Sequence, residues 1–312
     1  MQILSQENII KEKTCATIGF FDGVHLGHRF LLEKLKKTAV SSNFCSLVVT
    51  FKNHPQSFLG TLNEVGARHA LPLLSTENEK LDLISEINPD FCLLLDFNNE
   101  ISSMKAADFL LFLKNNYSVE KLIIGYDHRF GADKISDFEQ YKIIGETLGI
   151  EVEQCEPLYL PDNQGVSSSK IRKLLIDGNV ETAKDLLGRE YSISGIVKSG
   201  EKIGRTIGFP TANLSVDFQK QIPKAGVYSV EVEIKSGVFI GMLYIGNRPT
   251  LDGKNLTIEV NIFDFSEDIY NQKISLKLKH FIREDKKFNS LQELKNHLVK
   301  DKKKVLEFLA HR

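Results

Sequence analysis

The feature that most restricts the fold is a change in hydrophobic period near Gly188. Before this point, short apolar runs alternate with amphipathic stretches that carry helix-start signals, such as the capping boxes Thr76/Glu79 and Ser136/Glu139. Strands that alternate with helices form right-handed βαβ units around a parallel sheet with helices on both faces. The first half therefore predicts a Rossmann-like α/β domain with a parallel sheet. Its expected strands are Cys15–Phe20, Cys45–Phe51, Phe91–Leu95 and Lys121–Gly125.

After Gly188 the pattern is one of short strands without intervening helices, separated by turns rich in Gly, Pro and Asn. Such a series is typical of a closed antiparallel β-barrel. A helix is expected at the C-terminus, where Ser290 and Glu293 form another capping box. A length of 312 residues favours two domains, which we place at 1–187 and 188–312. The expected barrel strands are Tyr191–Lys198, Val227–Ile234, Val238–Ile245, Leu256–Phe263 and Ile274–Phe281.

Charge and composition narrow the class of protein. The chain has 40 Lys and Arg against 41 Asp and Glu, so no nucleic-acid-binding face is expected, although a local pocket can still hold phosphates. The Lys302–Lys304 run is interpreted as a solvated helix face. The four cysteines lack zinc-ligand spacing and lie in apolar runs, as expected for reduced thiols in the cytoplasm. We expect neither a signal peptide nor a membrane span.

A segment rich in glycine and histidine, Gly19–His28, follows the first of these strands and opens the first helix. Ligands of parallel sheets bind at the carboxyl ends of the strands. Glycines let a backbone approach phosphate oxygens, and a helix start offers free N–H groups. His25 and His28 could both donate to one polyphosphate and stabilise charge that develops during a displacement. Two alternatives stay open, namely structural histidines and a metal site, although a third ligand is not obvious nearby.

A second candidate segment combines hydroxyls with a guanidinium at the start of a later helix. Ser167 and Ser168 can cap this helix and also donate to phosphate oxygens. Arg172 lies one turn beyond Ser168 on the same face, where it could neutralise a leaving pyrophosphate. The alternative is an ordinary helix cap with a solvated arginine.

The barrel half opens with a third candidate segment, Gly195–Asn213. Its glycines could wrap phosphates with backbone N–H groups, although the spacing is not that of a P-loop. Thr211 and Asn213 point the same way on an extended chain, and their hard oxygens suit Mg²⁺. Glu259 shares one strand face with Asn261, opposite the apolar positions. The alternatives are a generic turn cluster and a solvent-facing glutamate.

The first half resembles the nucleotidyltransferase part of the bacterial bifunctional riboflavin kinase/FAD synthetases. The match lies in G-F-F-D-G-V-H-L-G-H, in Thr50–Pro55, which is similar to T-F-x-P-H-P with Asn53 in place of proline, and in Val166–Arg172. The last segment is similar to I-S-S-T-x-I-R, with Ser169 in place of threonine. The loop Gly125–Gly131 resembles a flavin-side loop. The resemblance implies catalytic roles for His25, His28 and Arg172, and nucleotide- or flavin-binding roles for Gly19, Phe20, Asp22, Gly23, Gly27, Asp127, Ser167 and Ser168.

The second half is similar to the riboflavin kinase domain of the same family, with the signature G-x-V-x-x-G-x-x-x-G-R-x-x-G-F-P-T-A-N. By this resemblance Glu259 is the general base, and Thr211 and Asn213 contact Mg²⁺ and ATP. Asn261 stands where histidine is frequent. The remaining nucleotide-binding positions that the resemblance implies are Gly195, Gly200, Gly204, Gly208 and Arg248.

The resemblance implies an enzyme that phosphorylates riboflavin to FMN and then joins FMN to AMP, giving FAD and pyrophosphate. ATP would be the co-substrate of both steps and Mg²⁺ the cofactor, with riboflavin, FMN, FAD and ATP as ligands. One alternative is a riboflavin kinase whose N-terminal half is an inactive, regulatory nucleotide-binding domain. Another is an adenylyltransferase for a different phosphate substrate, against which the barrel signature counts.

Overall fold

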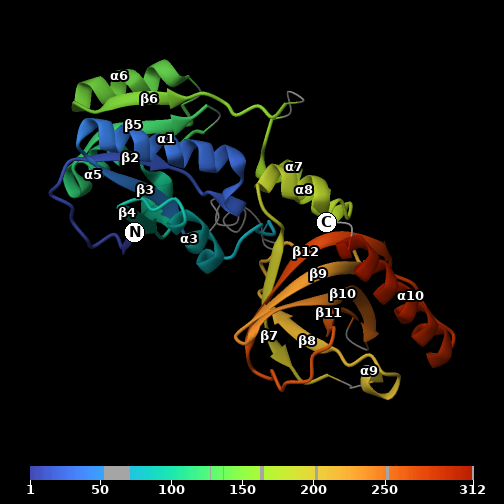
Figure 1. The fold of residues 1–312 in the computed structure, drawn as a ribbon. Helices are drawn as coiled ribbons and strands as arrows, with labels where there is room; N and C mark the ends of the chain where they lie inside the picture. Colours follow the sequence, from blue (N-terminus) through green and yellow to red (C-terminus); the bar gives the residue numbers. More distant parts are fainter. Residues whose placement is uncertain are drawn as a thin grey trace. The chain divides into compact units, whose positions relative to one another are not determined.

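The computed structural model describes residues 1–52, 71–126, 128–135, 137–161, 165–200, 203–250 and 253–310. The chain divides into two compact units, Met1–Ser168 and Ser169–Arg312, and each has its own sheet (Figure 1). Within the described ranges, no helix is long and apolar enough to cross a membrane.

The first unit contains the expected parallel sheet, with six strands in the order β1-β4-β3-β2-β5-β6. The pattern did not reveal the two edge strands. One is only three residues long, and the other alternates acidic and apolar residues because an edge strand is partly solvated. The strands are β1 (Gln2–Leu4), β2 (Thr14–Ile18), β3 (Cys45–Phe51), β4 (Phe91–Leu95), β5 (Val119–Gly125) and β6 (Glu151–Cys155).

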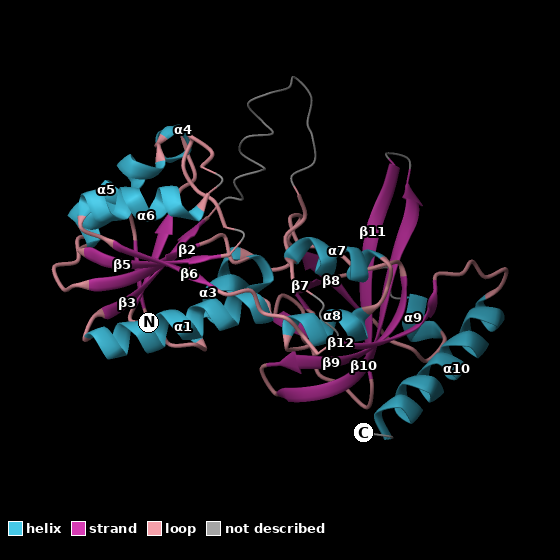
Figure 2. Cartoon of the chain, turned by 90° about the horizontal axis from the view of Figure 1, so that it is seen from above, coloured by secondary structure: helices cyan, strands magenta, loops and turns pink. Residues whose placement is uncertain are grey.

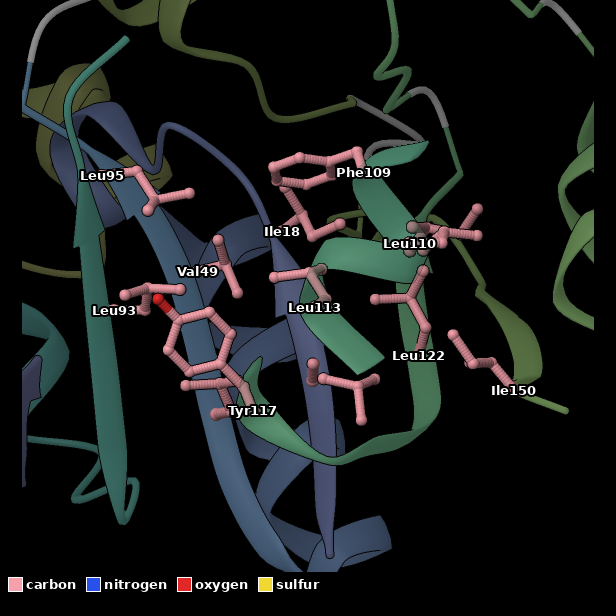
Figure 3. Packing of buried hydrophobic residues seen from close by; sticks show 14 of the residues in the cluster. Ile18, Val49, Leu93, Leu95, Phe109, Leu110, Leu113, Tyr117, Leu122 and Ile150 are labelled. Atoms are coloured by element: carbon pink, nitrogen blue, oxygen red, sulfur yellow. The ribbon is translucent and has the colours of Figure 1, made fainter. Parts of the chain in front are cut away.

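Helices cover both faces of this sheet (Figure 2). On one face, α1 (Leu26–Ser42) and α3 (Glu77–Ser85) pack against β2, β3 and β4. On the other face, α4 (Asn99–Ser103), α5 (Ala106–Tyr117) and α6 (Phe138–Leu148) close a larger core, in which α5 packs over β2 and β3 (Figure 3). Apolar residues three and four positions apart on α5 form the stripe that this packing requires.

Helix caps fix where these helices begin. The Thr76/Glu79 capping box of α3 is confirmed, with both of its hydrogen bonds present. Ser136 lies outside the described residues, and the cap of α6 is Asp137, whose carboxylate accepts the Glu139 N–H.

The second unit is the expected closed antiparallel barrel, with its six strands in the order β10-β11-β8-β7-β12-β9. The short strand β8 was not expected, because its residues follow a glycine-rich loop. Helix α10 covers one part of the barrel through the buried Val305. The elements are β7 (Ser192–Lys198), β8 (Ala212–Val216), β9 (Gly226–Ile234), β10 (Gly237–Thr250), β11 (Gly253–Ile262) and β12 (Lys273–Glu284), with α7 (Ser168–Ile176), α8 (Val180–Leu187), α9 (Ile203–Thr206) and α10 (Leu291–Ala310).

Candidate active sites

The chain leaves β2 through a strained turn. A single 3-10 turn, η1 (Asp22–Val24), lies between the strand and α1. Phe21 and Val24 have φ values of 56° and 36°, which are costly for residues with a Cβ and most of all for a β-branched one. Gly23 has φ 76°, and a Cβ there would lie 2.8 Å from Leu74. Such a backbone persists only where neighbouring contacts enforce it.

Asp22 supplies those contacts. It is 3% exposed, and its carboxylate accepts the backbone N–H groups of Leu74 and Ser75, each at 3.2 Å. In return, Ser75 accepts the Gly23 N–H at 3.0 Å. The Ser168 hydroxyl donates to the Asp22 carbonyl at 3.0 Å. Asp22 therefore links three segments of the chain: the turn after β2, the residues before α3 and the start of α7.

The two histidines lie together at the start of α1. His25 is the N-cap, and its Nδ1 accepts the His28 N–H at 3.3 Å. Because Nδ1 is an acceptor, the proton of the neutral ring resides on Nε2. The rings are stacked with centroids 3.6 Å apart, and Phe21 packs edge-on against His28. The structure thus brings the predicted pair together at the carboxyl end of β2.

The other predicted residues of the first half are placed as follows. Gly19 follows β2 directly, and the Phe20 carbonyl accepts the Thr50 hydroxyl at 3.1 Å from the end of β3. Gly27 lies in the first turn of α1. Ser167 is exposed, whereas Arg172 is 7% exposed on α7 and belongs to the second unit. Asp127 and Asn53 lie outside the described residues.

The barrel brings together the three predicted polar residues of the kinase half. Glu259 on β11 is paired in register with Asn213 on β8. The Thr211 hydroxyl donates to Glu259 Oε2 at 3.0 Å. Asn261, buried two residues beyond Glu259, donates to the Pro210 carbonyl at 2.6 Å and so holds the segment that carries Thr211. Two neighbouring strands therefore fix a carboxylate, a hydroxyl and an amide side by side.

The glycine-rich segment approaches this cluster closely. A Cβ on Gly200 would lie 2.2 Å from Asn213 Nδ2, so a larger residue there would displace the Asn213 side chain. The other predicted glycines occupy separate places, with Gly195 in β7, Gly204 in α9 and Gly208 just after it. Arg248 lies on β10 opposite Asn255, and its side chain is outside the described part of the structure.

The donor atoms of the Thr211–Asn213–Glu259 cluster fit a hard cation. A hydroxyl, an amide oxygen and a carboxylate are the ligand types that Mg²⁺ accepts, and Mg²⁺ usually keeps phosphate and water ligands as well. In the described ranges, no group of three or more His, Cys, Asp and Glu side chains could hold a metal by itself. A cation in this cluster would therefore depend on nucleotide phosphates and water for its remaining ligands.

Sequence reasoning missed two residues near these clusters. Lys80 on α3 is 2% exposed and reaches the end of β3, although lysine normally indicates a solvated position. Tyr244 is paired in register with Glu259, and its hydroxyl donates to Asp285 at 3.0 Å. The alternation of β10 could have placed Tyr244 on the Glu259 face once the strand pairing was known.

The folds and the two clusters define a two-domain enzyme that acts on nucleotides, with an α/β nucleotidyltransferase half and a barrel kinase half. The FAD synthetase family model matches residues 7–170, and the riboflavin kinase family model matches residues 187–309. The chain belongs to the bifunctional riboflavin kinase/FMN adenylyltransferase family.

Full-length relatives agree with this assignment. The chain is 35% identical to the bifunctional riboflavin kinase/FMN adenylyltransferase of Haemophilus influenzae, over 96% of this chain and 95% of that protein. The protein of that name in Bacillus subtilis is 32% identical, over 100% and 98% of the two chains. A crystal structure described as a macrolide-efflux protein from Streptococcus pneumoniae superposes with a TM-score of 0.86 at 30% identity, covering 97% of this chain and 98% of that one.

The segment between the two family matches contains most of α7 and α8. The compact second unit begins at Ser169 and includes both helices apart from the first residue of α7. The predicted boundary at 187/188 lies just after α8 and stays a prediction about where the chain can be cut.

Proposed function

We propose that the barrel half transfers the γ-phosphate of ATP to the 5′-hydroxyl of riboflavin, giving FMN and ADP. The α/β half then transfers AMP from a second ATP to FMN, giving FAD and pyrophosphate, in the cytoplasm. The observation that carries the proposal is the Thr211–Asn213–Glu259 cluster. It brings a carboxylate together with a hydroxyl and an amide on the barrel, which suits a base and cation ligands, while the histidine pair lies on the other unit.

In the kinase step, Glu259 accepts the proton of the attacking hydroxyl. Thr211 and Asn213 would hold Mg²⁺, which neutralises phosphate charge when bound. Asn261 keeps the Thr211 segment against β11, so that the hydroxyl and the carboxylate stay within hydrogen-bond reach of one another. The glycine at position 200 leaves the Asn213 side chain in place, because a Cβ there would overlap its amide.

In the adenylyl transfer, the FMN phosphate is itself the nucleophile and no covalent enzyme intermediate is needed. In the neutral ring of His25 the proton lies on Nε2, because Nδ1 accepts the His28 N–H. We assign this Nε2–H as a donor to the ATP phosphates. His28, stacked on it, would contribute a second donor to the same phosphates, and Arg172 would neutralise the leaving pyrophosphate. Preorganised donors of this kind stabilise charge that develops on the phosphate oxygens.

A direct assay tests the proposal. The purified chain is incubated with riboflavin, ATP and MgCl₂, and FMN and FAD are separated by chromatography. Both products should form, and EDTA should abolish them. Formation of FMN alone, together with failure to convert added FMN, would instead identify the N-terminal half as an inactive nucleotide-binding domain. Formation of neither product would refute the proposal.

The Glu259→Gln substitution separates the two activities. It keeps the shape and removes the carboxylate, so FMN formation should fall by about 100-fold or more, in the range of general-base effects. FAD formation from supplied FMN should stay within twofold of wild type, because none of the residues proposed for that step lies on the barrel strands. Equal loss of both activities would contradict the role assigned to Glu259.

A further inference from the structure

Lys80 is a buried cation at the carboxyl ends of the parallel strands, where we propose the adenylyl site. It lies in the first turn of α3, after the Thr76 cap, and is 2% exposed. Its Nζ donates to the Phe51 carbonyl at 2.5 Å, at the carboxyl end of β3. The same ammonium lies 4.2 Å from the ring centroid of Phe20, the second residue after β2. One side chain therefore joins the ends of two adjacent strands.

The charge of Lys80 matters because the turn after β2 carries a buried carboxylate. Asp22 has its negative charge within the turn that is proposed to receive a polyphosphate, and like charges repel strongly where water is excluded. Burial lowers the pKa of Lys80 to about 8, while the charges facing it, Asp22 on η1 and Glu77 on α3, favour its protonated form. Cys92 on β4 also faces it, as a thiol whose pKa is raised to about 12.

We propose that Lys80 is a positioning residue of the adenylyltransferase half, which offsets the charge of Asp22 and holds Phe20 and Phe51 so that the turn can bind the phosphates of ATP. This inference rests on the proposed function of that half. The hydrogen bond to Phe51 and the contact with Phe20 account for the positioning, and the buried Asp22 accounts for the need for a positive charge. Lys80 does not touch the reacting atoms.

The test is the KM for ATP in FAD formation from supplied FMN, measured from pH 6 to pH 9.5. In the wild type, KM should rise above about pH 8, because Lys80 loses its charge there. Lys80→Met should raise KM by roughly tenfold at pH 7, the order expected when one charge leaves a poorly solvated cluster. The alkaline rise should be absent from Lys80→Met. Lys80→Arg, which stays charged, should keep KM below that of Lys80→Met and should also lack the alkaline rise.

A matched control is Lys36→Met. Lys36 also donates to a backbone carbonyl, that of Ile87 at 3.1 Å, but it lies on α1 away from the turn. Its replacement should leave KM for ATP and the pH profile unchanged.

Two results would overturn the inference. One is a wild-type KM that stays flat through pH 8, a measurement that needs no variant and so does not depend on the folding of Lys80→Met. The other is a Lys80→Met protein with a shifted melting temperature but an unchanged KM, as expected of a purely structural lysine. The proposed function fails separately, if the wild type makes no FAD from FMN at all.

Discussion

His25 caps a helix with the same side chain that we propose as a donor to phosphates. Its Nδ1 satisfies a backbone N–H that an α-helix leaves unpaired, and this bond decides which ring nitrogen carries the proton. Glu259 is fixed in a similar way by Thr211. Contacts within the protein thus orient both of these proposed functional groups, and such preorganisation is what catalysis by positioned charges requires.

The His28→Ala substitution tests the proposed role of this histidine in the adenylyl half. It should lower FAD formation from FMN by about 100- to 1,000-fold, as for the loss of one preorganised donor. FMN should accumulate from riboflavin, because the barrel is untouched. His28 also packs on His25 and Phe21, so a melting curve of the same preparation is needed. Intact FAD synthesis with a lowered melting temperature would assign His28 to packing alone.

The sequence identifies reactive residue types well and their environment poorly. The motifs containing His25, His28, Thr211 and Glu259 could be read directly, because glycine spacing and strand alternation are local properties. Lys80 could not, since its burial depends on how α3 packs on β3. The structural role of Asp22 likewise depends on Leu74 and Ser75, which lie some fifty positions further along the chain.

Among the elements, α8 is attached to the barrel by charge as well as by apolar contact. Glu190, just after α8, pairs with Lys184 of that helix at 3.0 Å and with Lys279 of β12 at 3.3 Å. Burial alone would raise the pKa of Glu190. Hydrogen bonds from Lys184 and from its own backbone, together with the charge of Lys279, outweigh this effect and lower the pKa to about 2.

Glu190→Gln should therefore destabilise the barrel unit in a pH-dependent way. The pKa in the folded protein lies below the ordinary value of 4.5, so Glu190 contributes stability above about pH 4.5. That contribution declines as the pH falls through the folded-state value near 2. Urea unfolding should show a lower stability for the variant at pH 7 and a shrinking difference towards pH 3. A difference that is constant with pH would mean that the charge of Glu190 is not responsible for the loss of stability.

For the whole molecule, the sequence predicts the two-domain architecture, because the hydrophobic period of each half is a signal summed over many residues. The parallel sheet and the closed barrel both follow from it, whereas β1, β6 and β8 do not. These strands are short or partly solvated, so their hydrophobic signal is weak. The sequence also does not show which domain α7 and α8 belong to, since the apolar face of an amphipathic helix does not reveal which of two cores it covers.

Because α8 and all but the first residue of α7 belong to the second unit, the structure predicts where the chain can be divided. The apolar side of α8 is buried, and Glu181 at its start pairs with His280 of β12. A fragment of residues 169–312 keeps these contacts and should form FMN with a KM for riboflavin close to that of the full chain. A fragment of residues 188–312 loses the contacts of α8 with the barrel. Removing several buried aliphatic side chains, at about 1.5–3 kcal/mol each, should lower its melting temperature markedly. Its KM should stay the same in the molecules that remain folded, because the Thr211–Asn213–Glu259 cluster lies on other strands. The test is to measure the melting temperature and the rate of FMN formation for both fragments. Equal melting temperatures would show that α8 is not part of the barrel unit.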